Sequence, residues 1–278
     1  MLTPFVMDFQ PHVTSAKIPP TRQITVLDEF GTTRLISIPG EYPLTVFVDK
    51  QELVTLMTLG AEPEFLVLGF LRNQRLVANL NEIESVTVDW EVNAAAVKTR
   101  AGINRLLDKT SKRTVTSGCG QGTVFGDLMS EIDAMRFPPV GSSLSKFSQS
   151  SLYGIMDTVR RQESIYRSAG SVHGCGLFVG DQCLNFVEDV GRHNAIDTIA
   201  GAMWFNDEPG RDKVLYTTGR LTSEMVIKSA QMGIRSVISR SGVTLMGYEI
   251  GSRLGMTLVG RAKNRHYLCY CGSELFDR

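Results

Sequence analysis

The chain has 278 residues, and its 29 lysines and arginines balance 29 aspartates and glutamates, so that the formal net charge at pH 7 is zero. A neutral chain has no general electrostatic affinity for nucleic acid or for an anionic membrane surface, and no apolar run approaches the length that spans a bilayer. Five cysteines without a disulfide-framework spacing, and an N-terminus without the basic and apolar regions of a signal peptide, indicate a cytoplasmic protein with reduced thiols.

The first half of the chain predicts short strands around one helix. Residues 1–22 hold four prolines in polar surroundings and are expected to form an irregular arm. Alternating or β-branched apolar residues predict strands at 24–27, 34–38, 44–48, 85–92 and 95–98. The first two of these strands are expected to form a hairpin. Pro63, which stands between two glutamates, predicts a helix start because proline suits the first turn and acids suit its positive end.

The second half alternates strands with helices. Prolines, glycine and serines at 137–143 show no periodicity and mark a domain boundary, which divides the chain into an α+β domain at 1–138 and an α/β domain at 139–278. Helices are predicted at 144–167, 188–204, 223–232 and 244–254, and strands at 173–179, 183–187, 214–217, 236–239 and 256–259. This alternation indicates right-handed crossovers and a mostly parallel sheet that is covered on both faces.

The segment E-D-V-G-R-H-N-A-I-D at 188–197 opens one of these helices with an unusual arrangement of charge. At 100° per residue, one broad arc of the helix carries the apolar residues Ala195, Ile196, Ile199, Ala202 and Met203. The same arc, extended back into the first turn, carries Asp189 and Arg192, with His193 at its border. Buried charges are costly unless they are paired or bind something. The segment is therefore either a structural ion-pair cluster or part of a ligand site.

Cys119 is a candidate reactive thiol. It stands among small and cationic residues, namely Lys112, Arg113, Gly118, Gly120 and Gly122. The glycines remove side-chain bulk around the sulfur, and a helix expected to start near Thr123 and to run to about Met135 would favour the thiolate through its positive end. The alternative is a cysteine in a flexible loop whose reactivity is incidental.

The other cysteines are weaker candidates. Cys175 and Cys183 lie in predicted strands, where a free cysteine behaves as a small buried hydrophobe. Cys269 and Cys271 are too close in sequence for the usual zinc chelate, and strand alternation would place both thiols on one face without another ligand. We therefore expect no structural zinc.

Two loops have the composition of phosphate-binding turns. The segments 217–223 and 239–242 each lie between the carboxyl end of a strand and a helix start, and each offers an arginine, hydroxyl groups and a glycine. Open α/β sheets bind ligands at such positions, and helix N-termini there favour phosphate. The arginines are Arg220 and Arg240. Ordinary capping turns with surface arginines are the alternative interpretation.

A third cationic element lies near the C-terminus. It consists of Arg261, Ala262, Lys263, Asn264, Arg265 and His266. The chain has no acidic residue between Glu249 and Glu274, so this region is locally cationic in a neutral protein. The alternative to ligand binding is a solvated surface.

Five segments together resemble the formate dehydrogenase accessory sulfurtransferase (FdhD) family. They are T-S-G-C-G at 116–120, V-H-G-C-G-L-F at 172–178, E-D-V-G-R-H-N-A-I-D at 188–197, T-S-E-M-V-I-K-S-A at 222–230 and M-T-L-V-G at 256–260. They occur in the family's order and cover the chain from about residue 40 to the C-terminus. The resemblance implies a cytidine-deaminase-like three-layer fold for the C-terminal α/β domain, beside a smaller α+β N-terminal domain.

The resemblance also implies the chemistry of Cys119, which falls on the family's persulfide-carrying cysteine. The family loop commonly reads C-G-x-C-G, whereas Gly122 stands here at the second cysteine's position. A single thiol can accept a sulfane sulfur and pass it on, but it cannot resolve the persulfide into an internal disulfide. Sulfur transfer is therefore expected, and the two-cysteine version of the mechanism is not.

The family's substrate is a molybdenum or tungsten bis(molybdopterin guanine dinucleotide) cofactor. Residues 261–266 match the segment that contacts it, although phenylalanine is common in the family at Arg261 and glycine at Arg265. The two arginine loops would hold the dinucleotide, with GDP as a fragment of it, and Asp189, Arg192 and His193 would shape the pocket. The implied partners are a cysteine desulfurase, the formate dehydrogenase catalytic subunit and a second copy of the chain in a homodimer.

Two other functions compete with sulfur transfer. A zinc-dependent deaminase would need H-x-E and P-C-x-x-C, but His193 is followed two residues later by Ala195 and the chain has no C-x-x-C. A chaperone that shelters the molybdenum cofactor without handling sulfur is consistent with Gly122.

Overall fold

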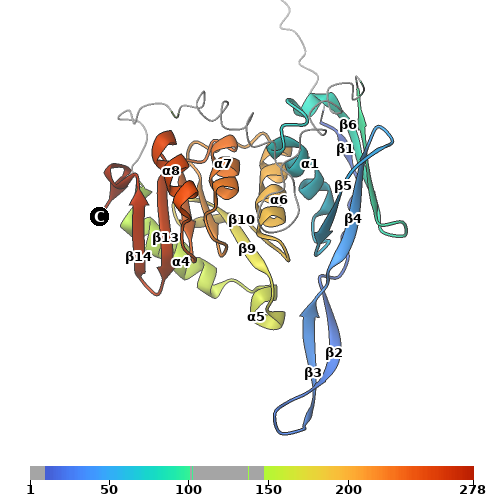
Figure 1. Cartoon of the computed structure of the whole chain (residues 1–278), viewed down its shortest axis with the longest axis horizontal. Helices are drawn as coiled ribbons and strands as arrows, with labels where there is room; N and C mark the ends of the chain where they lie inside the picture. Colours follow the sequence, from blue (N-terminus) through green and yellow to red (C-terminus); the bar gives the residue numbers. More distant parts are fainter. Residues whose placement is uncertain (1–9, 101, 103–136, 138–146) are drawn as a thin grey trace, which may run out of the picture.

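A computed structural model describes residues 10–100, 102, 137 and 147–278 of the chain (Figure 1). It is a mixed α/β structure with a five-stranded sheet in the N-terminal part and a six-stranded sheet in the C-terminal part. The predicted helix at 123–135, the Cys119 loop and all of the predicted boundary at 137–143 except Phe137 lie outside the described residues. None of the described helices is long and apolar enough to cross a membrane.

The five-stranded sheet has the order β1-β6-β7-β4-β5. Its strands are β1 (His12–Val13), β4 (Tyr42–Val48), β5 (Gln51–Thr58), β6 (Ile83–Asp89) and β7 (Ala94–Thr99). Helix α1 (Pro63–Asn73) packs on this sheet, and the short 3-10 turn η1 (Leu80–Glu82) precedes β6. The helix begins at Pro63 as predicted. Strand β5, at the edge of this sheet, was not predicted.

The predicted hairpin is confirmed and consists of β2 (Thr21–Leu27) and β3 (Thr33–Pro39). It forms a sheet of its own and projects from the end of the five-stranded sheet (Figure 1). The arm before it is not wholly irregular, because β1 pairs in parallel with β6.

The six-stranded sheet has the order β10-β9-β11-β12-β13-β14. Its strands are β9 (His173–Val179), β10 (Gln182–Asp189), β11 (Val214–Thr217), β12 (Ser236–Ser239), β13 (Thr257–Lys263) and β14 (His266–Cys271). Only the pairings of β12 with β11 and with β13 are parallel, and the other three are antiparallel. The expectation of a mostly parallel sheet is therefore wrong, because β9 and β10 form a hairpin that adds to the edge of β11.

Helices cover both faces of this sheet. On one face, α6 (Arg192–Phe205), α7 (Ser223–Gln231) and α8 (Leu245–Leu254) enclose a core of residues such as Ile199, Val226 and Leu258. On the other face, α4 (Gln149–Arg161) contributes Leu152 and Ile155 to a second core. The C-terminal turn η2 (Ser273–Leu275) leads into β15 (Phe276–Asp277), which pairs with β8 (Phe147–Ser148) beside that core.

The single helix predicted over 144–167 is two helices in the described part of the chain. Helix α4 ends at Arg161, and α5 (Ile165–Ala169) begins after a new N-cap at Ser164, whose side chain accepts a hydrogen bond from the Arg167 backbone N–H. The carboxylate of Glu188 accepts hydrogen bonds from the backbone N–H groups of Ile165 and Tyr166. This contact with β10 fixes the start of α5, and sequence periodicity does not reveal it.

The two sheets are joined by the close crossing of α1 and α6 (Figure 1). A Cβ atom at Gly69 would lie 1.7 Å from the backbone oxygen of Asp197, and one at Gly201 would lie 1.9 Å from the backbone oxygen of Phe65. Both positions therefore require glycine, because the helix backbones are in direct contact.

Candidate functional site

The two predicted arginine loops lie side by side at the carboxyl ends of β11 and β12. The Arg240 backbone N–H donates to the backbone carbonyl oxygen of Thr217 at 2.9 Å. The Ser239 hydroxyl donates to the backbone carbonyl oxygen of Gly219 at 2.6 Å. The Ser241 hydroxyl also donates to the Thr218 oxygen at 2.9 Å. These bonds connect the loops because β11 and β12 are parallel neighbours whose ends meet at one sheet edge.

A pocket of about 580 Å³ opens at this edge, on the face that α4 covers. This volume lies within the roughly 300–1,000 Å³ range of small-molecule sites. The strand ends and the β13–β14 turn contribute Tyr216, Thr218, Arg240, Ala262, Lys263, Asn264 and Arg265 to its lining. The opposite wall comes from α4, α5 and β10.

The pocket is predominantly cationic. Its basic residues are Arg160, Arg167, Arg240, Lys263 and Arg265, and its acidic residues are Asp157 and Glu188. Two of the arginines lie over aromatic rings: Arg240 is 5.6 Å from the centroid of Tyr166, and Arg265 is 5.0 Å from that of Tyr153. A site with this composition suits a ligand that has both negative charge and an aromatic surface.

The β13–β14 turn presents its side chains to this pocket through an unusual backbone. Asn264 has φ 50° and Arg265 has φ 66°, as a tight hairpin turn of this type requires. Lys263 and His266 form the pair that closes the turn. Glycine is the residue that adopts this conformation most readily, so the turn holds Arg265 in a backbone conformation that residues with a side chain rarely adopt.

The remaining cationic residues predicted for the site lie outside the pocket lining. Arg261 and His266 are exposed, and the Arg261 backbone N–H donates to the Ser241 oxygen at 2.7 Å. Arg220 is also exposed and does not line the pocket, although its charge contributes to lowering the pKa of His173.

Each carboxylate oxygen of Asp189 accepts two hydrogen bonds. One carboxylate oxygen accepts from the Thr58 hydroxyl at 2.5 Å and from the Leu59 backbone N–H at 3.1 Å. The other oxygen accepts from the Gly191 backbone N–H at 3.0 Å and from the Asn194 side chain at 2.8 Å. Burial raises the pKa of Asp189, and these donors act in the opposite direction. The carboxylate thus ties the start of α6 to the end of β5.

Arg192 and His193 are buried, and some of their polar atoms have no partner in the described structure. Arg192 Nε and both ring nitrogens of His193 form no hydrogen bond. Burial, together with the charges of Lys228 and Arg192, lowers the pKa of His193 to about 2. The imidazole is therefore neutral at pH 7, and its 3.4 Å approach to Glu224 is not a salt bridge. Buried polar atoms without partners at a helix N-terminus are consistent with a ligand site.

Sequence reasoning did not select several residues of these surroundings. Tyr153 and Tyr166 line the pocket, and the helical periodicity at 144–167 included only Tyr166, as part of an apolar face. Thr222 and Glu224 stand at the N-terminus of α7 near His193, and the Thr222 hydroxyl is buried without a hydrogen-bond partner in the described structure. The T-S-E sequence at 222–224 could have indicated Thr222 and Glu224, because threonine followed by an acidic residue is typical of a helix start.

The four cysteines in the described residues are free thiols. Cys175 is completely buried, as predicted, and burial raises the pKa of its thiol to about 12. Cys183, Cys269 and Cys271 are half-buried. Within the described ranges, no group of three or more histidine, cysteine, aspartate or glutamate residues could hold a metal ion.

The fold and the pocket define a mixed α/β protein with a cationic ligand pocket at the ends of its central strands. The profile of the FdhD/NarQ family matches residues 39–277. The sulfur carrier protein FdhD of Bacillus licheniformis is 30% identical over 234 residues, which cover 84% of this chain and 88% of that protein. The corresponding protein of Listeria innocua is 30% identical over 249 residues, which cover 88% and 94% of the two chains.

The chain therefore belongs to the FdhD/NarQ family. A solved structure supports the fold: the crystal structure of a protein assigned as a formate dehydrogenase accessory protein, from Desulfotalea psychrophila, superposes with a TM-score of 0.71. The two chains are 23% identical, and the match covers 94% of this chain and all of that one.

Proposed function

We propose that this protein is a sulfur carrier for the maturation of formate dehydrogenase in the cytoplasm. It would receive sulfur from a cysteine desulfurase as a persulfide on Cys119. It would pass this sulfur to a molybdenum or tungsten bis(molybdopterin guanine dinucleotide) substrate before that cofactor enters the catalytic subunit of formate dehydrogenase. Membership of the FdhD/NarQ family supports this proposal, as do the relatives whose names describe a sulfur carrier.

The cationic pocket is the structural observation that carries the proposal. A guanine dinucleotide has several negative phosphate charges and an aromatic base. Arg240, Lys263 and Arg265 suit the phosphates, and the tyrosine faces suit the base. GDP, as a fragment of the substrate, should bind here. Helices on both faces of the six-stranded sheet support the cytidine-deaminase-like layering that the family implies.

The sulfur transfer would take place in two steps, loading of Cys119 and delivery to the metal. In loading, the Cys119 thiolate attacks the terminal sulfur of the desulfurase persulfide, one S–S bond breaks as another forms, and the desulfurase thiolate leaves. Delivery to the metal as sulfide requires two electrons: a second thiol attacks the inner sulfur of the Cys119 persulfide, the S–S bond breaks as a disulfide between Cys119 and that thiol forms, and the outer sulfur leaves as sulfide. Because Gly122 occupies the place of the family's second cysteine, an external thiol would supply them in this protein.

Arg192 and His193 would contribute to the surroundings of the substrate. Their buried polar atoms that lack hydrogen bonds in the described structure would gain partners from a bound anion. Asp189 would act indirectly, because its oxygens already accept four hydrogen bonds and hold the first turn of α6 in place.

Two measurements test the proposal. After incubation with a desulfurase and cysteine, the intact mass should rise by one sulfur atom in the wild type and remain unchanged in Cys119→Ser. In calorimetry, Arg240→Ala should weaken GDP binding by about 1.5–3 kcal/mol, the value of a lost charge-assisted contact. Arg220→Ala is the matched comparison, and we expect a smaller loss because Arg220 does not line the pocket. Sulfur loading of the Cys119→Ser protein would contradict the assignment of the thiol.

A second candidate function is a chaperone that binds the cofactor without transferring sulfur. Gly122 in place of the second loop cysteine favours it. The two functions differ in one result: the chaperone would bind GDP normally, yet its wild-type mass would not rise after desulfurase treatment.

A further inference from the structure

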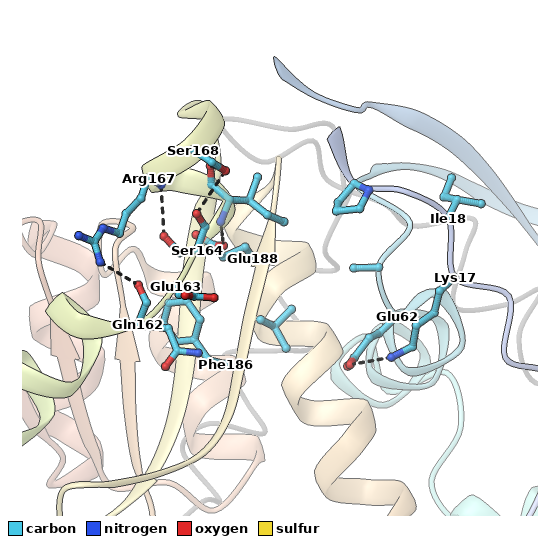
Figure 2. Close-up of a pocket in the computed structure, with 14 residues that line it drawn as sticks. Lys17, Ile18, Glu62, Gln162, Glu163, Ser164, Arg167, Ser168, Phe186 and Glu188 are labelled. Carbon is cyan, nitrogen blue, oxygen red and sulfur yellow. Dashed lines mark hydrogen bonds and ion pairs between the residues drawn. The ribbon is translucent and has the colours of Figure 1, made fainter. Parts of the chain in front are cut away.

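Two carboxylates lie in the lining of the cationic pocket, on Asp157 of α4 and on Glu188 of β10. A carboxylate repels the phosphates of a ligand, so each of the two requires another explanation. Glu188 has a structural one, because its oxygens accept hydrogen bonds from the backbone N–H groups of Ile165 at 2.6 Å and Tyr166 at 3.2 Å. Figure 2 shows Glu188 beside Ser164, the N-cap of α5. The Glu188 carboxylate therefore stabilises the start of α5 and need not contact a ligand.

The Asp157 carboxylate is held only by exposed side chains in the described structure. Its Oδ1 atom accepts a hydrogen bond from Arg160 Nη2 at 3.1 Å, and its Oδ2 atom lies 3.7 Å from Arg265 Nη2. The side chains of Arg160 and Arg265 are 71% and 69% exposed, and ion pairs with such side chains contribute little to stability. A distance of 3.7 Å is too long for a hydrogen bond, so among the described residues Oδ2 accepts none. A ligand can therefore take the place of these arginines.

Asp157 stands one helical turn from an aromatic ring of the same pocket. Tyr153, Asp157 and Arg160 all line the pocket, and their spacing of four and three residues places them on one face of α4. The Arg265 guanidinium lies 5.0 Å from the centroid of the Tyr153 ring, and the same side chain approaches Asp157 Oδ2. A flat base that stacks on this ring, or on the guanidinium above it, would thus have one edge at the carboxylate.

A carboxylate distinguishes the two purine bases by their hydrogen-bonding edges. Guanine carries two adjacent donors, N1–H and the amino group at C2, which match the two oxygens of a group that accepts hydrogen bonds and cannot donate them. Adenine has an unprotonated N1 at the corresponding place, and the lone pair of this nitrogen would face a negative oxygen. A carboxylate at the base edge therefore favours guanine and disfavours adenine.

We propose that Asp157 selects guanine in this pocket by accepting hydrogen bonds from N1–H and the C2 amino group of the base. This inference rests on the proposed function, because it takes the guanine dinucleotide as the ligand, and it adds the residue that determines which base is bound. Tyr153 would stack on the base, and Arg240 and Lys263 at the sheet edge would hold the phosphates. The Asp157 carboxylate would exchange its contacts with the two exposed arginines for contacts with the base.

Calorimetry on the full chain tests the inference, because charge and base recognition predict opposite results for Asp157→Asn. Loss of a negative charge from a cationic pocket should leave the affinity for pyrophosphate unchanged or raise it. The affinity for GDP should nevertheless fall at least about tenfold, since the amide NH2 group would face one of the two donors of the base. A variant that binds GDP as tightly as the wild type overturns the inference.

Two comparisons accompany this measurement. Asp181→Asn is the matched control, because the Asp181 side chain lies beside Gly154 of the same helix but outside the pocket lining; it should bind GDP as the wild type does. The wild type should bind GDP at least about tenfold more tightly than ADP. Equal affinities of the wild type for the two nucleotides overturn the inference.

Xanthosine diphosphate provides a test in which the variant should gain affinity. Xanthine has a carbonyl oxygen where guanine has the C2 amino group, so it repels a carboxylate and suits the NH2 group of an asparagine. Asp157→Asn should therefore bind xanthosine diphosphate at least about tenfold more tightly than the wild type does. A variant that fails to fold does not produce this gain, and its absence in a variant that still binds pyrophosphate overturns the base contact.

The outcomes separate this inference from the proposed function. If Arg240→Ala weakens GDP binding and Asp157→Asn does not, the pocket binds the nucleotide and Asp157 does not select its base. If the wild type does not bind GDP, the proposed substrate is contradicted together with the inference. Persulfide loading of Cys119 tests the sulfur transfer separately, and it should be unchanged in Asp157→Asn.

Discussion

Lys228 Nζ lies 2.8 Å from Asp197 Oδ2, and the two side chains are 3% and 0% exposed. The other carboxylate oxygen of Asp197 accepts a hydrogen bond from Asn73 Nδ2 at 2.7 Å. One buried carboxylate thus connects α1, α6 and α7. Burial raises the pKa of Asp197, and the charge of Lys228 and the Asn73 contact act against that rise. Asp197 and Lys228 lie in two of the segments that resemble the family, but the sequence predicted no role for either of them or for Asn73.

We predict that Lys228→Met destabilises the fold. The substitution leaves Asp197 buried without its counter-ion, which costs about 3–5 kcal/mol in the free energy of unfolding. Urea unfolding followed by circular dichroism measures this loss. The control is Lys228→Met/Asp197→Leu, which removes both charges and should recover much of the stability. A loss below about 1 kcal/mol in the single variant would show that the pair is not important for stability.

The crossing of α1 and α6 makes Gly69 a sensitive position. In Gly69→Ala the new methyl group would overlap the backbone oxygen of Asp197, so the helices must separate. We expect a loss of stability of about 1–3 kcal/mol or more, as for other overpacked cores. Gly242→Ala is the matched control because a Cβ there meets no atom within 4 Å. Equal stabilities of the two variants would contradict this interpretation of the crossing.

The neutral state of His193 predicts a dependence of stability on pH. Burial lowers its pKa in the folded state from 6.5 to about 2, so that between these values the unfolded chain binds a proton that the folded chain does not. Stability should therefore fall as the pH falls below 6.5, by at most roughly 1.4 kcal/mol per pH unit from this residue. His173, whose pKa is also lowered by burial, contributes in the same direction.

Urea unfolding at several pH values between 7 and 5 measures this slope. His193→Gln should flatten it, because glutamine does not titrate. The comparison variant is His266→Gln, at an exposed histidine. An unchanged slope in His193→Gln would mean that His193 carries a proton in the folded protein.

Arg265→Gly should separate backbone strain from ligand binding. Glycine adopts the φ of 66° found at this position without penalty, so stability should be unchanged or higher by about 1 kcal/mol. GDP affinity should fall, because a positive charge is removed from the pocket lining. Asn93→Gly relieves a similar φ of 52° at a residue outside the pocket lining, and its GDP affinity should remain that of the wild type. Equal affinities in both variants would exclude a role for Arg265 in binding.

Gly122 predicts a long-lived persulfide. No second loop thiol is available to attack loaded Cys119, so Gly122→Cys should shorten the persulfide lifetime and allow a disulfide under mild oxidation. Sulfide release over time from the loaded proteins measures this. The wild type should release sulfide slowly. If it releases sulfide rapidly and Cys175→Ser/Cys183→Ser does not, Cys175 or Cys183 is the thiol that attacks the persulfide. The full burial of Cys175 and its pKa of about 12 argue against that outcome.

Local sequence patterns predicted most of the secondary structure correctly. The β2–β3 hairpin, the helix at Pro63 and the strands β11 and β12 follow from apolar alternation, proline placement and turn residues within a few positions of one another. That the Arg220 and Arg240 loops meet at one sheet edge followed from their places after neighbouring strands, whereas the segment 261–266 was indicated by the family resemblance, and its role in binding stays a prediction. The Cys119 loop lies outside the described residues, and its role stays a prediction.

Tertiary contacts decided the features that sequence patterns did not reveal. The antiparallel pairing of β9 with β11, the hydrogen bonds from the start of α5 to Glu188, and the hydrogen bond between Thr58 and Asp189 each depend on residues that are distant in sequence. The sequence by itself determined which residues are apolar, cationic or helix-forming, because these properties belong to single side chains and their near neighbours. Only the folded chain determined which buried polar atoms found partners, because a hydrogen bond between Thr58 and Asp189 exists only when both strands reach the same place.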